Sequence, residues 1–99
     1  MRIVFSSETL LLDDFVVNED LLKAIELALN GQWDAAHSLV QQYETDNNAA
    51  WIHAVLHKIE GDAGNSRYWY RRGGKLEHFP DEPRAELAVI RKFLMGGGL

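Results

Sequence analysis

The segment WIHAVLHKIEGDAGNSRYWYRRGG, residues 51–74, decides how this chain folds. It predicts two helices that are separated at Gly61-Asp62, because Gly readily ends one helix and Asp caps the next. It also holds two of the three Trp, two of the three Tyr and two of the four His. We therefore expect both the fold and any specific chemistry to centre on this segment.

Similar signals on either side of the segment predict further helices. Asn18 is placed to cap a first helix, the polar turn Thr45-Asp46-Asn47-Asn48 to cap a third, and Asp81 to cap a last one that has Pro83 in its first turn. The chain is then one domain, residues 1–99, made of an N-terminal arm (1–17), a first hairpin (18–43), a second hairpin (47–74), a C-terminal helix (81–95) and a flexible tail (96–99).

An internal repeat links the two predicted hairpins. When the chain is laid on itself at a shift of thirty residues, small and apolar positions coincide: Ala24 with Ala54, Ile25 with Val55, Leu29 with Ile59, Gly31 with Gly61, and Ala36 with Ser66. Small residues let two helix backbones approach closely, and a fixed period of this length is typical of stacked helical hairpins.

This pattern resembles the tetratricopeptide repeat over about residues 20–74. The first unit offers Ala24 and the run Gly31-Gln32-Trp33-Asp34-Ala35-Ala36, and the second offers Ala54, Gly61, Ser66, Tyr70 and Gly73. The chain departs from the family in its shorter period, in Ala63 where the family has an aromatic residue, and in Tyr43 at a small-residue position. The resemblance implies an all-α fold of two stacked antiparallel helical hairpins, to which we add a C-terminal capping helix.

Residues 51–72 are also similar to a family of small uncharacterised microbial proteins that share the segment W-x-H-A-x-L-H-x-x-E-G-D-x-x-N-x-x-Y-W-Y-R-R. This resemblance implies no activity. It marks the segment as the functional face.

The composition excludes several classes of function. There are no cysteines, so the chain offers neither a disulfide framework nor a thiolate metal site. The net charge of −5 disfavours nucleic-acid binding, although residues 63–99 carry a local excess of basic side chains. No apolar run is long enough to span a bilayer and the N-terminus does not resemble a signal peptide, so we expect a cytoplasmic protein with no membrane partner.

Three polar residues of the third helix, His53, His57 and Glu60, stand at positions i, i+4 and i+7 and so project from one face. Two imidazoles with this spacing can share a divalent metal such as zinc, and the carboxylate can be a third ligand or a base. Alternatively the imidazoles are buried and hydrogen-bonded to Tyr70, Trp69 or the backbone, or they lie on the surface. His37 and His78 join this group only if the fold brings them near.

The fourth helix carries aromatic and basic residues together: Arg67, Tyr68, Arg71 and Arg72. Such residues dominate the energetics of protein interfaces, and a solvated helix face would place them at the surface. Either the Arg side chains lie on an ordinary solvated face and pair with Glu60, Asp62 or Glu77, or an exposed patch at Tyr68 and Arg72 binds a partner.

A non-catalytic interaction or self-association module is the function that these patterns favour, with a protein partner or a second copy of the chain as its ligand and no cofactor. The alternative is binding of a metal or a small anionic ligand, with hydrolytic chemistry open to it, at His53, His57 and Glu60 beside the Arg67–Arg72 cluster. The predicted core comprises Leu22, Ile25, Leu29, Trp33, Ala36, Val40, Ile52, Leu56, Ile59, Trp69, Tyr70, Leu87 and Ile90.

Overall fold

The structure is a computed structural model that describes residues 2–96 and the side chains of residues 15–96. Within this range it contains helices and no strand: α1 (Arg2–Leu29), α2 (Trp33–Val40), α3 (Asn47–Ile59), α4 (Ala63–Gly73) and α5 (Pro83–Leu94), with short 3-10 helices η1 (Gln41–Tyr43) and η2 (Leu76–His78). The all-α prediction with five helices is confirmed.

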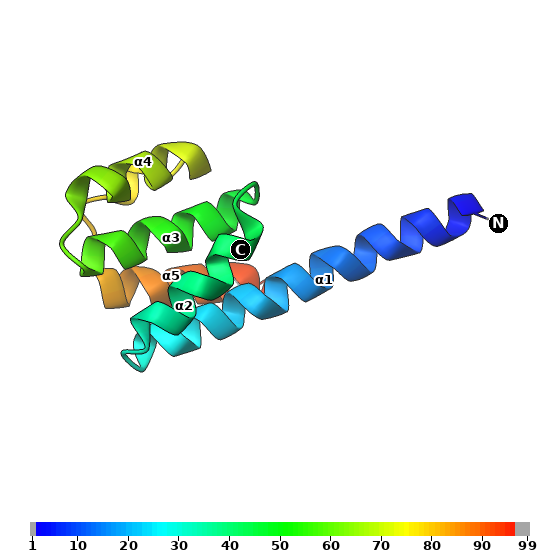
Figure 1. Ribbon diagram of the computed structural model, residues 1–99, viewed down its shortest axis with the longest axis horizontal. Helices are drawn as coiled ribbons and strands as arrows, with labels where there is room; N and C mark the ends of the chain where they lie inside the picture. The colour runs from blue at the N-terminus through cyan, green and yellow to red at the C-terminus, as the bar shows by residue number, and fades with distance from the viewer. Residues whose placement is uncertain (1, 97–99) are drawn as a thin grey trace.

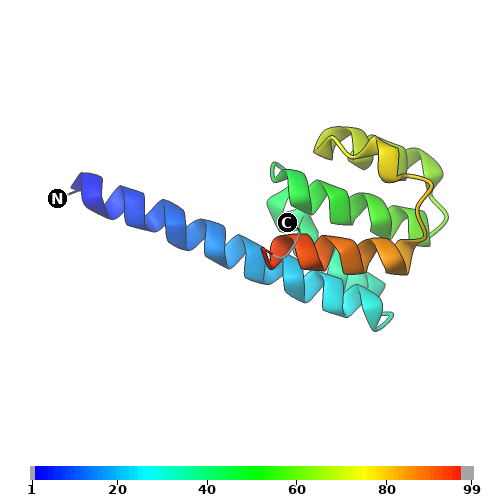
Figure 2. The same cartoon turned by 180° about the vertical axis from the view of Figure 1, so that it is seen from behind.

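Helices that are consecutive in the chain pack as two pairs, α1 with α2 and α3 with α4 (Figure 1). α2 also contacts α3, which joins the two pairs. α5 packs against both α1 and α3, and Figure 2 shows it from behind, lying between those two helices. The last helix therefore covers the first helix of each pair.

Positions thirty residues apart have equivalent structural roles. Ala24 and Ala54 are both fully buried, and Gly31 and Gly61 both end a helix in the left-handed conformation, at φ +80° and +83°. Glycine adopts this φ without steric cost, which explains why it recurs at both turns. The two turns thus share a backbone conformation, and the two alanines share the same degree of burial.

Gly73 explains how α3 and α4 come so close. A Cβ atom at this position would lie 2.9 Å from the carbonyl oxygen of Asn47 and 3.3 Å from the backbone nitrogen of Trp51. Any side chain at residue 73 would therefore push the two helix backbones apart. Their close contact helps to bring Trp69 of α4 against His53 of α3.

The helix starts agree with the sequence in two cases and differ in two. The Asp46 and Asp62 side chains accept from the backbone N–H groups of Ala49 and Asn65, as expected of caps. The predicted start at Asn18 is wrong, because α1 is continuous from Arg2 to Leu29. Glu82, not Asp81, caps α5 by accepting from the Ala85 N–H.

The predicted division of the chain changes accordingly. Residues 2–17 belong to α1 instead of forming a separate arm, and the side chains of residues 1–14 lie outside the described residues, as do residues 97–99 of the predicted tail. The Asp81 carboxylate instead accepts a hydrogen bond from His78 Nδ1, 2.7 Å away. Asp81 and Glu82 are neighbouring acids that fit the cap position equally well in the sequence, and in the structure Glu82 forms the capping bond.

The core contains most of the predicted residues. Ile25, Ala36, Val40, Ile52, Leu56, Tyr70, Leu87 and Ile90 are buried, whereas Leu22, Leu29, Trp33, Ile59 and Trp69 are only partly buried. Leu21, Trp51 and Val55 are buried without having been predicted. No helix of the described chain combines the length and apolarity needed to cross a membrane.

A carboxylate lies at the centre of this core. Glu86 of α5, which is 2% exposed, accepts from Trp51 Nε1 (2.8 Å), Tyr70 OH (2.8 Å) and Lys58 Nζ (2.7 Å). Lys58 Nζ also reaches the carbonyl oxygens of His78, Phe79 and Asp81. We call Glu86, Trp51, Lys58 and Tyr70 the Glu86 cluster.

Candidate metal centre

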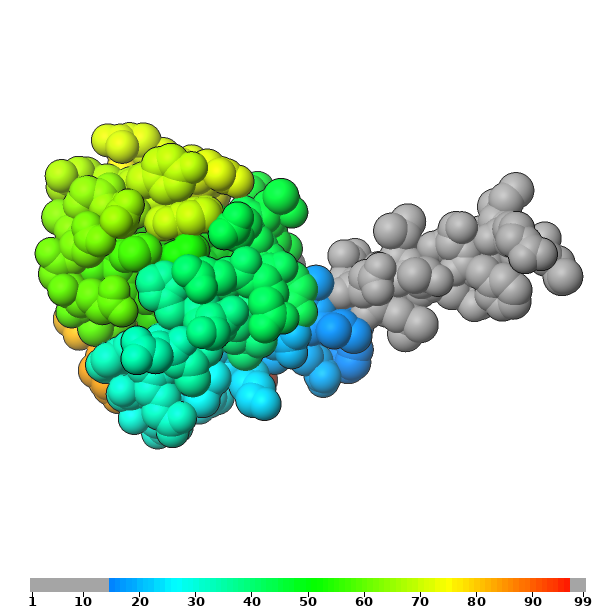
Figure 3. Space-filling view, in the orientation of Figure 1, coloured from blue at the N-terminus to red at the C-terminus, as the bar shows by residue number. Residues whose placement is uncertain are grey.

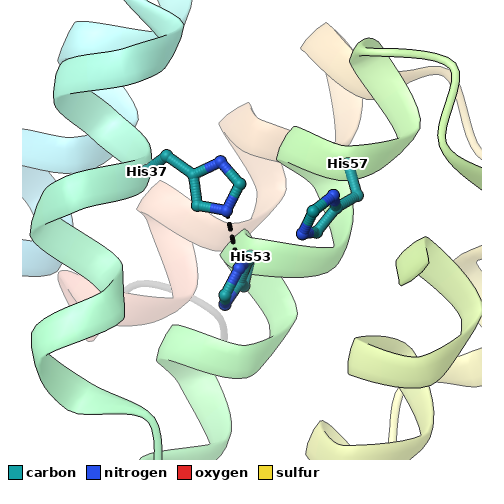
Figure 4. Close-up of side chains that lie close together, drawn as sticks. All are labelled: His37, His53 and His57. Atoms are coloured by element: carbon teal, nitrogen blue, oxygen red, sulfur yellow. Dashed lines mark hydrogen bonds between the residues drawn. The ribbon is translucent and has the colours of Figure 1, made fainter.

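Three imidazole rings from two helices come together on the other side of α3. His53 and His57 stand one turn apart on α3, and His37 reaches across from α2, as Figure 4 shows. The ring centroids are 4.5 Å apart for His37 and His53, 4.7 Å for His37 and His57, and 5.0 Å for His53 and His57. We call these three residues the histidine cluster.

Local structure accounts for this placement. The i, i+4 spacing puts His53 and His57 on one face of α3, where their rings stack at an interplanar angle of 15°. The η1 turn and the Asp46 cap reverse the chain between α2 and α3, so that α2 packs against α3. On the visible face in Figure 3, the segments of α2 and α4 flank α3.

The cluster is covered by α4 at His53 and is partly open to solvent on the side of His37 and His57. His53 is 3% exposed, and its ring stacks on Trp69 with centroids 4.0 Å apart. The side chains of His37 and His57 are 17% and 14% exposed. Solvent therefore reaches the group through His37 and His57.

Hydrogen bonding within the cluster is incomplete. His37 Nε2 and His53 Nε2 are 2.7 Å apart and form one bond, in which the tautomers decide which ring donates. His57 Nδ1 is buried and has no hydrogen-bond partner. Leaving a buried polar atom unpaired costs about 1–3 kcal/mol, so packing alone gives a poor reason for three histidines here.

Burial keeps the imidazoles of His53 and His57 neutral. It is the main cause that lowers the pKa of His53 to about 3, with His37 and His57 adding to the effect. Burial also lowers the pKa of His57, beyond what the Asp62 and Glu60 carboxylates restore. A neutral imidazole is the form that ligates metal, so no proton has to be removed from either ring at neutral pH.

Two carboxylates border the open side of the cluster. Glu60 places one oxygen 3.8 Å from His37 Nδ1 and the other 3.9 Å from His57 Nδ1. Asp62 places an oxygen 3.5 Å from His57 Nδ1. Hydrogen bonds from Asn65 lower the pKa of Asp62, so it stays ionised.

The arrangement offers a metal a common point of attachment. His37, His53 and His57 each present a ring nitrogen within 4.8 Å of those of the other two. Three imidazoles with a fourth position for water or substrate form one of the known types of zinc site. The absence of cysteine leaves imidazole as the principal ligand for a metal of this class.

A second group, His78, Asp81 and Glu86, also meets this distance criterion. It makes a poor metal site because Glu86 is already bonded by three donors and Lys58 Nζ occupies the space beside it. The histidine cluster is therefore the stronger of the two.

The structure brings His53 and His57 together with His37, and it leaves His78 apart beside Asp81. Glu60 borders the group, 3.8 Å from His37 Nδ1 and 3.9 Å from His57 Nδ1, but it is not among the converging ligand atoms. The expected bond from Tyr70 to an imidazole is wrong, because its hydroxyl donates to Glu86. Trp69 contacts His53 through its ring face.

The predicted partner-binding residues are all exposed on α4, but they do not share the same neighbours. Arg67 lies over the Phe79 ring at 5.2 Å, whereas Arg72 lies over Trp69 at 5.3 Å and donates to Tyr68 OH at 3.2 Å. Tyr68 is 48% exposed, and Arg71 is exposed as well. Arg67 thus faces a different neighbour from Tyr68 and Arg72.

Comparison of the chain with protein-family models, with curated proteins and with solved structures found no match.

Proposed function

We propose that this protein binds a divalent transition metal ion of the zinc class at His37, His53 and His57. The convergence of three imidazoles from two helices carries the proposal. Imidazole suits zinc, copper, nickel and cobalt, whereas calcium and magnesium prefer oxygen ligands. The scaffold is a tetratricopeptide-like pair of hairpins, which is supported by the structural equivalence of positions thirty residues apart.

A metal would also make use of the features that packing leaves unexplained. Coordination would replace the single bond between His37 and His53 with a shared ion, and it would give His57 a role for its second nitrogen. Because His37 belongs to α2 and the other two to α3, the ion would link the first helix pair to the second.

A calorimetric zinc titration of the metal-free protein tests the proposal. We expect one zinc per chain, and His37→Ala should weaken binding by more than the about 100-fold that loss of a mere supporting residue can cost. His78→Ala is the matched control, because His78 is bonded to Asp81 and stands apart from the cluster. Equal affinities in all three proteins, or no binding by the wild type, would refute a site at the cluster.

Protein binding is the second candidate function, favoured by the exposed Tyr68 ring that Arg72 holds through its hydroxyl. A partner or a second copy of the chain could cover this surface with Arg67 and Arg71 at its edges. Light scattering at increasing protein concentration should show a rising mass that Tyr68→Ala lowers. A strict monomer would count against self-association.

A further inference from the structure

The fourth coordination position of the proposed metal site is the feature from which more can be inferred. We propose that the metal is held by the Nε2 atoms of His37, His53 and His57, and that its remaining position faces solvent and takes water or a small anionic ligand. Glu60 and Asp62 then act as positioning residues outside the coordination sphere. This inference rests on the proposed metal site.

We assign Nε2 as the ligating atom of each ring, starting from His37 and His53. His37 Nε2 and His53 Nε2 already face each other at 2.7 Å, and Figure 4 shows the His37 ring directed from α2 toward His53. With zinc–nitrogen bonds of about 2.0–2.1 Å, two ligands of a tetrahedral ion lie roughly 3.3 Å apart. A shift of about half an ångström would therefore admit the ion between these two rings.

The outer nitrogens are the Nδ1 atoms, and they face carboxylates. His37 Nδ1 is 3.8 Å from Glu60, and His57 Nδ1 is 3.5 Å from Asp62 and 3.9 Å from Glu60. A metal-ligating histidine usually donates its other ring N–H to such an acceptor, which fixes the tautomer and the ring orientation. The unpaired Nδ1 of His57 would gain its hydrogen bond in this way.

Glu60 is poorly placed to be the fourth ligand. Its two oxygens are directed at the outer nitrogens of two different rings, one at His37 and one at His57. Within the described residues, the group with converging ligand atoms consists of the three histidines and does not include Glu60. The protein thus offers three ligands where a zinc ion takes four or five.

The open side of the cluster determines what completes the coordination. Trp69 covers His53, whereas the side chains of Glu60 and Asp62 are 35% and 44% exposed. Three neutral imidazoles leave the ion with its full charge of two, so a small anion such as a carboxylate, a phosphate or azide is favoured at the remaining position. This is the arrangement of a site that can exchange ligands.

Cobalt(II) in place of zinc makes the fourth position visible, because its absorption spectrum reports the ligands around it. We expect the spectrum of the cobalt-loaded wild type to change when azide is added. Glu60→Gln should keep this azide response while lowering cobalt affinity by about 10–100-fold, as is typical for loss of a carboxylate that orients a ligand. Glu77→Gln, at an acid 68% exposed beside His78, is the control and should change neither.

Each other outcome has a distinct meaning. If the wild type is insensitive to azide but Glu60→Gln responds, Glu60 is the fourth ligand and the inference is overturned. If both are insensitive, the site is closed by another group, which also overturns it while leaving metal binding intact. If no cobalt absorption develops at all, the proposed metal site itself fails.

Discussion

Two polar clusters lie on α3, and they differ in how well their hydrogen-bonding groups are satisfied. In the Glu86 cluster a buried carboxylate meets an ammonium, an indole N–H and a phenol, and each donor points at an oxygen 2.7–2.8 Å away. In the histidine cluster three rings share one hydrogen bond, and a buried nitrogen has none. The first cluster needs nothing more, whereas the second has three ring nitrogens within 4.8 Å of one another and one buried nitrogen without a partner.

This contrast separates a structural role from a functional one. Burial penalises charge unless it is paired, and the Glu86 cluster meets that condition inside the core. Burial and the hydrogen bond to Glu86 raise the pKa of Tyr70, which keeps its hydroxyl protonated as a donor. In the histidine cluster His53 and His57 instead stay neutral, and the group is partly open to solvent, as the proposed metal site requires before it is loaded.

The largest difference between the clusters should come from removing one member of each. Glu86→Ala leaves Lys58 buried without its counter-ion, and breaking a buried pair in this way costs about 3–5 kcal/mol of unfolding free energy. His37→Ala in the metal-free protein removes one partly exposed ring and one hydrogen bond, so it should cost only about 1 kcal/mol. Urea unfolding monitored by circular dichroism measures both.

The comparison depends on which of the two variants, Glu86→Ala or His37→Ala, loses more unfolding free energy. If His37→Ala destabilised the metal-free protein as much as Glu86→Ala, the histidine cluster would be a structural core element. A Glu86→Ala protein as stable as the wild type would show that the charge pair is not what holds α5 on α3.

A smaller effect should follow from Tyr70→Phe, which deletes only the hydroxyl that donates to Glu86. A hydrogen bond to a charged group contributes about 1.5–3 kcal/mol. Tyr68→Phe is the matched control, because the Tyr68 hydroxyl accepts from Arg72 at the surface and its loss should change stability by less than about 0.5 kcal/mol. Thermal unfolding of the two variants would contradict this if their melting temperatures fell equally.

The smallest effect near neutrality should be the dependence of stability on pH. His53 has a folded pKa of about 3 against 6.5 in the unfolded chain, and that of His57 is also lowered. The unfolded state therefore binds more protons in this range, so stability is full above pH 6.5 and falls as the pH drops toward 3. The loss approaches about 1.4 kcal/mol per pH unit for each such proton. Replacing His53 with Gln should flatten the profile between pH 6 and 4, and an unchanged slope would contradict the assignment.

The sequence was sufficient to predict those features that depend on local spacing. Helical geometry and capping chemistry within a few residues account for the turn glycines, the Asp46 and Asp62 caps, and the shared face of His53, His57 and Glu60. The long α1 helix was missed because Asn18 is an equally good cap or mid-helix residue when read locally.

The remaining features depend on contacts between distant residues. His37 is sixteen residues from His53 in the chain, and it joins the cluster only because α2 packs on α3. No local pattern distinguishes it from a surface histidine. Glu86 is an acid in an amphipathic helix, and its burial depends on Trp51, Lys58 and Tyr70 all converging on it. Its position one residue before the buried Leu87 was the available signal, and it is a weak one.

The most direct test of the metal site is a zinc titration followed by nuclear magnetic resonance of the histidine side-chain nitrogens. We predict that the Nε2 signals of His37, His53 and His57 shift together to metal-bound positions at one equivalent of zinc. Their Nδ1 atoms should keep their protons, and His78 should not change. If the three signals stay at their metal-free positions, or if zinc shifts His78 instead, the histidine cluster is not a metal centre.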